Sequence, residues 1–223
     1  MISALDEKTA AAREAIKHVK DGMLLGLGTG STFEVFLGLL EKKIKAGLHV
    51  RGIPSSRRTE ELAARAGVEI ADEVRSGIDL DIDGTDEFDD RLFLIKGGGG
   101  ALFREKIIAS SSRKIIIIAD SSKYNPIGIG RFPVPVEITP FHPELTIARF
   151  RSIGIDCVLR GSGNYVTDSG NLIADCSMGT IEDPVAMESA LKAIPGVIEV
   201  GIFTGMDPVI YMGQGESVKV FQK

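Results

Sequence analysis

The chain has 223 residues, a hydrophobic content of 43% and a formal net charge of −5 at pH 7, so it is long enough to enclose a substantial core. Lysine and arginine are scattered, with no run longer than two, which argues against a nucleic-acid partner. The apolar run Ile115–Ala119 is too short to cross a bilayer, and no basic segment followed by an apolar one opens the chain. We therefore expect a cytoplasmic protein with no membrane partner.

Strands and helices alternate through the first half of the chain. Ser3 and Asp6 have the spacing of a helix-capping pair, and the apolar residues that follow suit one helical face until Gly22. Further strands are expected at 23–27, 50–53, 78–82, 92–95 and 114–119, and further helices at 33–44, at 57–66 and around Glu105. Repeated strand–helix–strand units predict an α/β fold with an open parallel sheet flanked by helices, which is Rossmann-like.

The pattern changes near Gly128–Pro135, where two glycines and two prolines in eight residues suggest a domain crossing. Beyond it, the order of the expected elements is that of a split βαβ, ferredoxin-like domain: strand 134–138, helix 144–153, strand 155–159, strand 171–176, helix 184–193 and strand 197–200. The apolar segments 209–212 and 218–220 should return to the first domain. We therefore expect an α/β domain formed by 1–130 plus 205–223 and a smaller α+β domain formed by 131–204.

Polar loops after the expected strands are the candidate site, because ligands of open α/β sheets bind outside the carboxyl ends of the strands. Four loops fit this rule: Gly28–Thr32, Asp83–Glu87, Lys96–Gly100 and Asp120–Lys123. If their strands share one sheet, the four loops meet at one edge and form one pocket.

Four consecutive glycines, Gly97–Gly100, precede the expected Glu105 helix. Such a run is costly to order, but its bare backbone lets N–H groups approach an anion closely where a helix start adds a positive dipole. Lys96 directly precedes the run, and Glu105 follows in the first turns of the helix. A cation, an anion cradle and a carboxylate therefore lie within ten residues.

The loop Gly28–Thr32 joins a strand to a helix, and its simplest interpretation is a tight turn with a capping hydroxyl. It is not a P-loop, since no Gly-Lys-Ser/Thr follows at the required spacing, and it lacks the third glycine of the dinucleotide fingerprint. Hydroxyls and amides at a helix start suit a monoester phosphate. We therefore expect a small phosphorylated ligand rather than a nucleotide.

The acidic run Asp79–Asp90 has two functional interpretations besides a solvated loop. Its first six residues match the start of an EF-hand calcium loop, but position 12 is Asp90 rather than Glu, position 8 is the charged Asp86, and the flanks look like strands. We favour the alternative, in which Asp83 and Asp86 project from a strand end into the pocket. The three histidines, His18, His49 and His142, match no metal or triad spacing, so no metal site is predicted.

Several single residues also have ordinary structural interpretations. Lys96 and Lys123 would each be a solvated surface side chain if they stood alone, and Glu105 could simply pair with a basic neighbour. Cys157 and Cys176 form no CxxC pair and lie in apolar, strand-like segments. We expect them to be free, buried thiols rather than a disulfide or a metal pair.

Five motifs follow one another along the chain: Gly28-Thr29-Gly30-Ser31-Thr32, Asp83-Gly84-Thr85-Asp86, Lys96-Gly97-Gly98-Gly99-Gly100-Ala101 with Arg104-Glu105-Lys106, Asp120-Ser121-Ser122-Lys123 and Phe132-Pro133-Val134-Pro135-Val136-Glu137. This ordered set resembles the signature of ribose-5-phosphate isomerase, type A. The resemblance extends from about Gly26 to Met212 and covers most of the chain.

The resemblance implies a cofactor-free aldose–ketose isomerase that interconverts ribose 5-phosphate and ribulose 5-phosphate in the pentose phosphate pathway, and a homodimer or homotetramer. Glu105 matches the family's proton acceptor. The family's substrate-binding segments match Thr29–Thr32, Asp83–Asp86, Lys96–Gly99 and Lys123. The sequence departs from the family's usual pattern at Thr85, where Ala is common, and in the segments 124–131 and 139–144, which bears on loop geometry and assembly.

The chemistry of this reaction agrees with these residue types. Glu105 would move a proton between C2 and C1 of the sugar, while Lys96 and the glycine amides would stabilise the cis-enediolate that forms. Ring opening needs a further proton relay, for which Asp83 is the first candidate and Asp86 the second. Ser31 and Thr32 would hold the phosphate, with Lys123 and Lys8 adding positive charge.

Two other classes of protein are weighed against this interpretation. A sugar-phosphate-sensing regulator with a related domain would be expected to carry a DNA-binding helix-turn-helix before it, and only about 22 residues precede the first expected strand. A related enzyme class, such as a sugar-phosphate deaminase or lactonase, is the second alternative. Formation of ketopentose phosphate from ribose 5-phosphate would exclude the sensor, whereas release of ammonia or acid from other sugars would redirect the enzyme assignment.

Overall fold

The computed structural model describes residues 3–74 and 77–223. Contacts divide the chain into two compact units, each assembled from segments that are distant in sequence. The larger unit contains the described part of 1–84 together with Arg104–Lys123 and Met206–Lys223, and the smaller unit contains Thr85–Phe103 and Tyr124–Gly205. This grouping assigns residues 85–103 and 124–130 to the smaller unit, whereas the sequence analysis expects them in the larger one.

Among the described residues, a seven-stranded sheet in the order β14-β13-β7-β4-β1-β2-β3 forms the centre of the larger unit. Neighbouring strands from β13 to β3 are parallel, and β14 is antiparallel to β13. The strands are β1 (Leu24–Leu27), β2 (Arg51–Pro54), β3 (Glu69–Ile70), β4 (Leu80–Asp83), β7 (Ile115–Asp120), β13 (Val209–Gln214) and β14 (Ser217–Phe221). The predicted α/β class and the return of the C-terminal segment to this sheet are confirmed.

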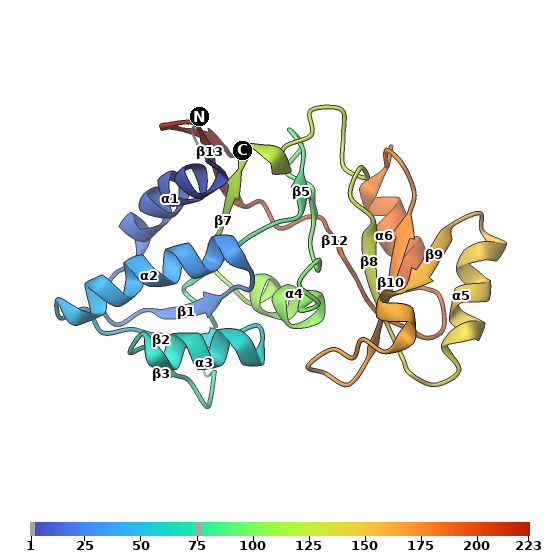
Figure 1. The fold of residues 1–223 in the computed structure, drawn as a ribbon, viewed down its shortest axis with the longest axis horizontal. Helices are drawn as coiled ribbons and strands as arrows, with labels where there is room; N and C mark the ends of the chain where they lie inside the picture. Colours follow the sequence, from blue (N-terminus) through green and yellow to red (C-terminus); the bar gives the residue numbers. More distant parts are fainter. Residues whose placement is uncertain (1–2, 75–76) are drawn as a thin grey trace. The chain divides into compact units, whose positions relative to one another are not determined.

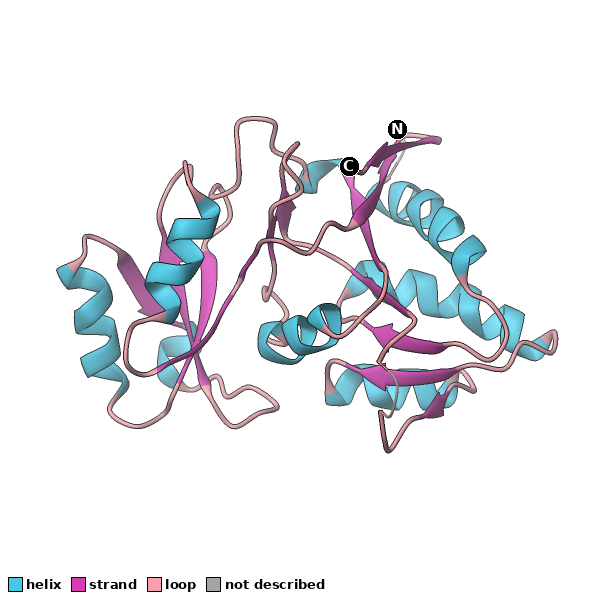
Figure 2. Cartoon of the chain, turned by 180° about the vertical axis from the view of Figure 1, so that it is seen from behind, coloured by secondary structure: helices cyan, strands magenta, loops and turns pink. Residues whose placement is uncertain are grey.

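Helices cover both faces of the large sheet (Figures 1 and 2). They are α1 (Ala4–Ala15), α2 (Ser31–Lys45), α3 (Arg57–Arg65) and α4 (Leu102–Ser110). The first three share one face, where Phe33 and Phe36 pack into one hydrophobic cluster with strand residues such as Ile116. On the opposite face α4 packs so closely that a side chain at Gly26 would collide with Ile108. No helix in the described ranges has both the length and the apolar character needed to cross a bilayer.

Local signals set the helix starts as the sequence predicts. The Ser3 hydroxyl accepts a hydrogen bond from the Asp6 amide (3.3 Å), and the Asp6 carboxylate accepts one from the Ser3 amide (2.9 Å). This reciprocal capping box satisfies two amide donors that the helix itself cannot bond. The predicted α1 cap is therefore confirmed.

The smaller unit contains a four-stranded antiparallel sheet in the order β11-β8-β10-β9. Its elements are β8 (Val134–Ile138), α5 (Pro143–Ser152), β9 (Asp156–Leu159), β10 (Leu172–Ser177), α6 (Pro184–Lys192) and β11 (Val197–Val200). Short 3-10 turns occur at Arg160–Gly163 in this unit and at Ile16–His18 and Ser121–Lys123 in the larger one. The strand order and the β-α-β-β-α-β sequence confirm the predicted ferredoxin-like arrangement.

A third sheet, with the order β12-β6-β5, also belongs to the smaller unit. It consists of β5 (Glu87–Phe88), β6 (Leu94–Ile95) and β12 (Ile202–Phe203), and all its pairings are antiparallel. The prediction that 92–95 is one of the parallel strands is therefore wrong. The Asp89 carboxylate accepts hydrogen bonds from the amides of Arg91 and Phe93, which turns the chain back so that β6 pairs with β5. A short apolar strand carries no signal that would distinguish the two pairings.

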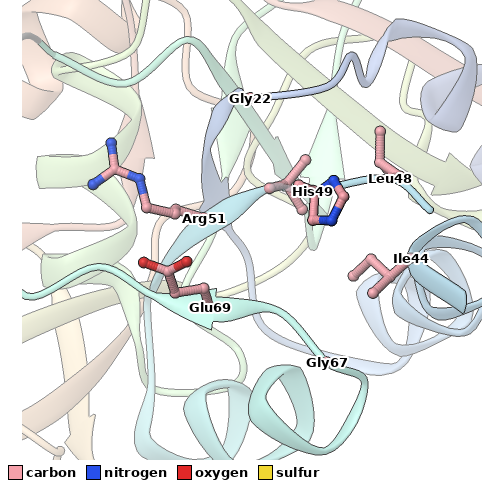
Figure 3. Close-up of a pocket in the computed structure, with 8 residues that line it drawn as sticks. Gly22, Ile44, Leu48, His49, Arg51, Gly67 and Glu69 are labelled. Carbon is pink, nitrogen blue, oxygen red and sulfur yellow. The ribbon is translucent and has the colours of Figure 1, made fainter.

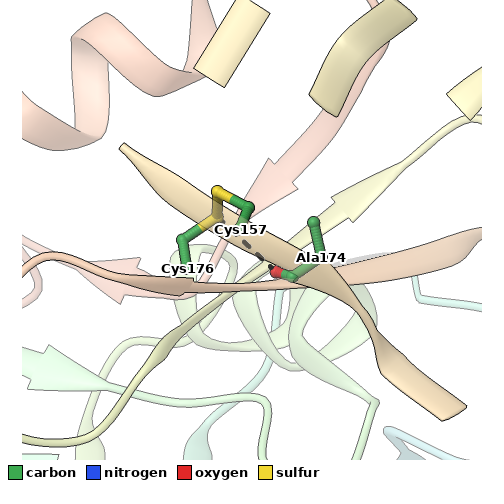
Figure 4. Close-up of a disulfide and its surroundings, with 3 residues drawn as sticks. All are labelled: Cys157, Ala174 and Cys176. Carbon is green, nitrogen blue, oxygen red and sulfur yellow. Dashed lines mark hydrogen bonds between the residues drawn. A yellow bond between two sulfur atoms is a disulfide. The ribbon is translucent and has the colours of Figure 1, made fainter. Parts of the chain in front are cut away.

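Cys157 and Cys176 form a disulfide, so the prediction of two free thiols is wrong (Figure 4). The two residues are direct partners in the antiparallel pair of β9 and β10, with their Cα atoms 4.0 Å apart. Their separation of 19 residues in sequence gave no sign of this register. The Cys176 sulfur also lies 3.9 Å from the Ala174 carbonyl oxygen, but a disulfide sulfur has no proton to donate.

Candidate active site

Three of the predicted loops lie at one edge of the large sheet. They follow β1, β4 and β7, which are neighbours and parallel, so their carboxyl ends meet. The fourth loop, Lys96–Gly100, follows β6 in the smaller unit.

Asp83 is fixed at the end of β4. Its side chain is buried, and its Oδ1 atom accepts hydrogen bonds from the amides of Thr29 (3.1 Å) and Gly84 (2.7 Å). Gly28 makes this approach possible, since a Cβ atom there would stand 2.0 Å from the same oxygen. The loop after β1 and the carboxylate after β4 thus form one rigid piece.

The Thr29 side chain is directed into a cluster of hydroxyl groups. Its Oγ1 atom lies 2.8 to 3.0 Å from the hydroxyls of Ser55, Ser56 and Thr59, and Thr59 in turn donates to the Gly28 carbonyl. This cluster ties the loop after β1 to the start of α3. Thr29 therefore stabilises the loop through both its hydroxyl, in this cluster, and its amide, which bonds Asp83.

The amino end of α2 presents backbone donors. Gly30 is its N-cap residue, with φ of 112°, and no side chain caps the helix there. A left-handed φ of this size suits glycine alone, and the first hydrogen bond within the helix runs from the Glu34 amide to the Gly30 carbonyl. Lys8 donates to the Ser31 hydroxyl (2.9 Å), and Thr32 is buried. Helix dipole, amides, hydroxyl and ammonium together favour an anion.

Glu7 anchors the loop after β7, a role that the sequence analysis missed. Its carboxylate accepts hydrogen bonds from the amide and hydroxyl of Ser121 and from the amide of Gly215. The Gly215 bond is the main reason why the pKa of Glu7 lies below its ordinary value; burial opposes the shift, and the Ser121 bonds add to it. Glu7 thereby orders the turn Ser121–Lys123, whose last residue is a predicted ligand, and it neighbours Lys8 on α1.

Glu105 lies in the first turn of α4 and is only 4% exposed. Its Oε2 atom is buried and accepts no hydrogen bond from the described residues. Carboxylates are rarely buried in this way, and the amino end of a helix favours their charged form. Glu105 thus has the surroundings of a functional carboxylate.

Lys96 and Asp86 belong to the smaller unit. The Lys96 side chain is buried, with its ammonium 5.6 Å from the centre of the Phe203 ring, and its amide donates to the Gly201 carbonyl. The Asp86 carboxylate accepts a hydrogen bond of 2.6 Å from the Gly98 amide. Thr85 donates its hydroxyl to the carbonyls of Glu87 and Ile95, a structural role for this departure from the family's pattern.

The glycine loop, residues Gly97–Gly100, is held on its carbonyl side. Arg160 donates from Nη1 to the carbonyls of Gly97 (3.0 Å) and Gly98 (3.1 Å), and the Tyr165 hydroxyl donates to that of Gly99 (3.3 Å). Gly97 and Gly100 have positive φ values of 104° and 83°. No motif in the sequence pointed to Arg160 or Tyr165, which lie more than sixty residues from the loop.

The predicted residues divide between the two units. The larger unit holds Thr29, Gly30, Ser31, Thr32, Asp83, Gly84, Glu105 and Lys123; the smaller unit holds Thr85, Asp86, Lys96, Gly97, Gly98 and Gly99.

The acidic run has separate partners along its length. Asp79 accepts from the Leu24 amide, Asp89 from the Arg91 guanidinium and Asp90 from the Tyr124 hydroxyl. Within the described residues, no group of three or more histidines, cysteines or carboxylates is placed to hold a metal ion.

A different pocket opens at the opposite edge of the large sheet (Figure 3). It has a volume of about 390 Å³ and is lined by Gly22, Ile44, Leu48, His49, Val50, Arg51, Gly67 and Glu69. Several of these residues lie at or just before the amino ends of β1, β2 and β3. Ligands of such sheets bind instead at the carboxyl ends of the strands. The pocket contains none of the predicted site residues.

Comparison with known proteins agrees with the motifs. The family model for ribose 5-phosphate isomerase A (phosphoriboisomerase A) matches residues 51–217. The ribose-5-phosphate isomerase A of Maricaulis maris is 45% identical over 99% of this chain and 100% of its own. The structure of ribose 5-phosphate isomerase A from Methanocaldococcus jannaschii has a TM-score of 0.92 and 38% identity, covering 99% of this chain and 100% of its own.

A D-ribose-5-phosphate isomerase solved in complex with phospho-erythronic acid has a TM-score of 0.94 and 37% identity, covering 100% of both chains. With the fold, the ordered motifs and these relatives in agreement, the chain belongs to the ribose 5-phosphate isomerase A family.

Proposed function

We propose that this protein interconverts D-ribose 5-phosphate and D-ribulose 5-phosphate. The observation that carries the proposal is the buried Glu105 carboxylate at the start of α4, in a chain of this family. Aldose–ketose isomerisation needs one base that removes a proton from C2 and returns it to C1. A carboxylate shielded from water and supported by a helix amino end suits both steps.

The phosphate of the sugar is proposed to bind at the amino end of α2. Ser31 and Thr32 would donate hydroxyl and amide hydrogen bonds there, and Lys8 would add a positive charge. Lys123, in the turn ordered by Glu7, is the second proposed cation. These contacts are remote from the reacting carbons, so they contribute binding energy that positions C1 and C2.

The reaction is proposed to pass through a cis-enediolate. Glu105 takes the C2 proton while the C1 carbonyl oxygen gains negative charge. The proton of the C2 hydroxyl passes to the C1 oxygen, and the same carboxyl group then delivers its proton to C1 as the C2 carbonyl forms. Lys96 and the glycine-loop amides would stabilise the charge on the sugar oxygens. No net oxidation occurs, because the hydrogen lost at C2 is regained at C1.

Ring opening precedes this step, because the closed sugar has no free carbonyl. Asp83 is the first candidate for the proton relay at the ring oxygen and the C1 hydroxyl, since two amides hold its Oδ1 atom in one position. Asp86 is the second candidate and is held by the Gly98 amide. Variants D83N and D86N, compared on open-chain and cyclic substrate, separate the two.

The direct test is incubation with ribose 5-phosphate and assay of the ketopentose phosphate that forms. Turnover that is lost in Glu105→Gln supports the proposal. Absence of turnover in the folded wild-type protein would contradict it, and release of ammonia or acid from other sugar phosphates would redirect the assignment. Because a phosphorylated sugar does not cross a bilayer unaided, we also propose that the enzyme acts in the cytoplasm.

A homo-oligomer is proposed on the basis of exposed apolar side chains in the smaller unit. Leu145 and Ile153 lie on or beside α5, Val158 lies on the edge strand β9, and all three are more than half exposed. Where such residues gather in one patch, they are typical of an interface. Sedimentation would show a dimer or a tetramer, and a monomer would contradict this part of the proposal.

A further inference from the structure

We propose that Arg160 is a positioning residue for catalysis, which aims the Gly99 amide of the glycine loop at the developing negative charge. This inference rests on the proposed isomerase reaction, in which that loop stabilises the enediolate. It concerns a residue that lies outside the ordered motifs and acts through the loop.

The Arg160 guanidinium contacts the loop from behind. Its Nη1 group donates to the carbonyl oxygens of Gly97 and Gly98, at 3.0 and 3.1 Å. Its side chain is 17% exposed, so solvent does little to screen these charge-assisted bonds. One partly buried cation therefore fixes two successive peptide units.

A trans peptide unit has its C=O and N–H groups pointing in opposite directions. When Arg160 holds the Gly98 carbonyl, the Gly99 N–H of the same peptide must point to the other side. The preceding peptide follows the same rule: its carbonyl bonds Arg160, and its N–H, on Gly98, bonds the Asp86 carboxylate at 2.6 Å. The positive charge also polarises both peptides and makes their N–H groups stronger donors.

Arg160 is itself held by the sheet of the smaller unit. Its Nε and Nη2 groups donate to the two carboxylate oxygens of Asp175 on β10, at 2.9 and 2.5 Å. Burial would lower the pKa of Arg160, but the hydrogen bonds and charge of Asp175 outweigh burial and raise it. The guanidinium thus remains charged and connects an irregular loop to a regular strand.

The geometry requires arginine. A guanidinium presents a fixed fork of donors that can bond Asp175 on one side and two carbonyls on the other, whereas a lysine ammonium is a single point on a flexible chain. Tyr165 completes the contact from the same side: its ring centre is 5.5 Å from the Arg160 guanidinium carbon, and its hydroxyl bonds the Gly99 carbonyl.

The test compares Arg160→Ala and Arg160→Lys with the control Arg91→Ala. Arg91 also bonds a carboxylate, that of Asp89, and a carbonyl, that of Glu182, but neither belongs to the glycine loop. We expect both Arg160 variants to lose about 10²-fold in kcat, as for one misdirected oxyanion donor, with KM little changed. The inhibition constant of phospho-erythronic acid should rise, and Arg91→Ala should keep the wild-type kcat.

Chemical rescue distinguishes positioning from a purely structural role. Guanidinium chloride well below denaturing concentration should restore kcat to Arg160→Ala without changing its Tm, and methylammonium should not. Equal kcat in Arg160→Ala and Arg91→Ala would overturn the inference, as would a loss confined to Tm. If Arg160→Ala fails to fold, Asp175→Asn and Tyr165→Phe give the same test, with a smaller loss of kcat expected and an unchanged kcat contradicting it.

The proposed reaction and the role of Arg160 can be disproved independently of each other. A folded wild-type protein that does not isomerise ribose 5-phosphate removes the proposed function itself. Wild-type turnover with unaffected Arg160 variants leaves the function in place and removes only the role of Arg160.

Discussion

The amino end of α2 and the glycine loop both present backbone N–H groups, yet they are ordered in different ways. At α2 the helix itself aligns the amides, and the side chains around it only add donors and charge. The glycine loop has no regular structure, and its carbonyls are fixed by Arg160 and Tyr165 instead. A regular element provides an anion site through its own geometry, whereas an irregular loop needs side chains from elsewhere in the fold.

The largest expected effect is the loss of activity on a sugar without phosphate, which distinguishes the amino end of α2 from the glycine loop. Unphosphorylated ribose should react with a kcat/KM lower by roughly 10³-fold or more, because it lacks the remote binding energy at α2. Replacing Ser31 and Thr32 together by alanine should erase much of that preference, whereas Lys96→Ala should impair both sugars. Steady-state kinetics with both sugars measures the ratio. A double variant that keeps the wild-type ratio would place the phosphate elsewhere.

The next effect isolates proton transfer from anion binding. Glu105→Gln preserves shape but removes the base, so kcat should fall by at least about 10²-fold. Binding of a phosphorylated substrate analogue should survive, because the proposed anion contacts are intact. Calorimetric titration and turnover of the same preparation provide the comparison, and near-normal turnover would exclude Glu105 as the base.

A smaller effect concerns the stability of the scaffold behind the glycine loop. Asp175 directly precedes Cys176 on β10, so the disulfide supports the strand that holds Arg160. Replacing both cysteines by alanine should lower the free energy of unfolding by about 3 kcal/mol, the value expected for a loop of this size. Hydrogen exchange should become faster in β9 and β10 and stay unchanged in β1 and α2. Uniform acceleration in both units would contradict a local role.

The smallest expected effect is the pH dependence of the stability that Glu7 contributes to the larger unit. The pKa of Glu7 is lowered in the folded state, so its contribution to stability is present above the ordinary value of 4.5 and is lost as the pH falls through the folded value. Glu7→Gln should therefore lower Tm at neutral pH, and the difference from the wild type should shrink in acid. A constant difference at all pH values would show that the Glu7 charge is not involved.

The features that could be predicted from the sequence are those that leave a periodic pattern or an ordered motif. The apolar spacing from Phe33 to Ile44 predicted α2, and the bounds of β8 and β11 were predicted as the structure has them. The candidate residues followed from motifs that are local in sequence. Their assignment to one substrate remains a prediction.

Contacts between distant residues could not be predicted, because they leave no local trace. The Arg160 bonds to the glycine loop join residues more than sixty positions apart, and the Glu7 bond to Gly215 joins residues 208 apart. The antiparallel pairing of β6 and the disulfide are similar cases, since each depends on which strand becomes a neighbour. Composition and periodicity predict which face of a strand is buried, but they do not predict which other strand pairs with it.

The chain passes between the two units four times, at residues 84/85, 103/104, 123/124 and 205/206. The passage 85–103 carries Asp86, Lys96 and the glycine loop, while β12 and Arg160, which order that passage, come from the later passage 124–205. Trimming the gene to the segments of the larger unit would therefore delete half of the proposed catalytic groups. Adding only 85–103 to those segments would retain the groups but would remove β12 and Arg160, which order them. The smaller unit is thus not an accessory module. A protein shortened to the larger unit could keep the seven-stranded sheet but would lose the proposed isomerase reaction.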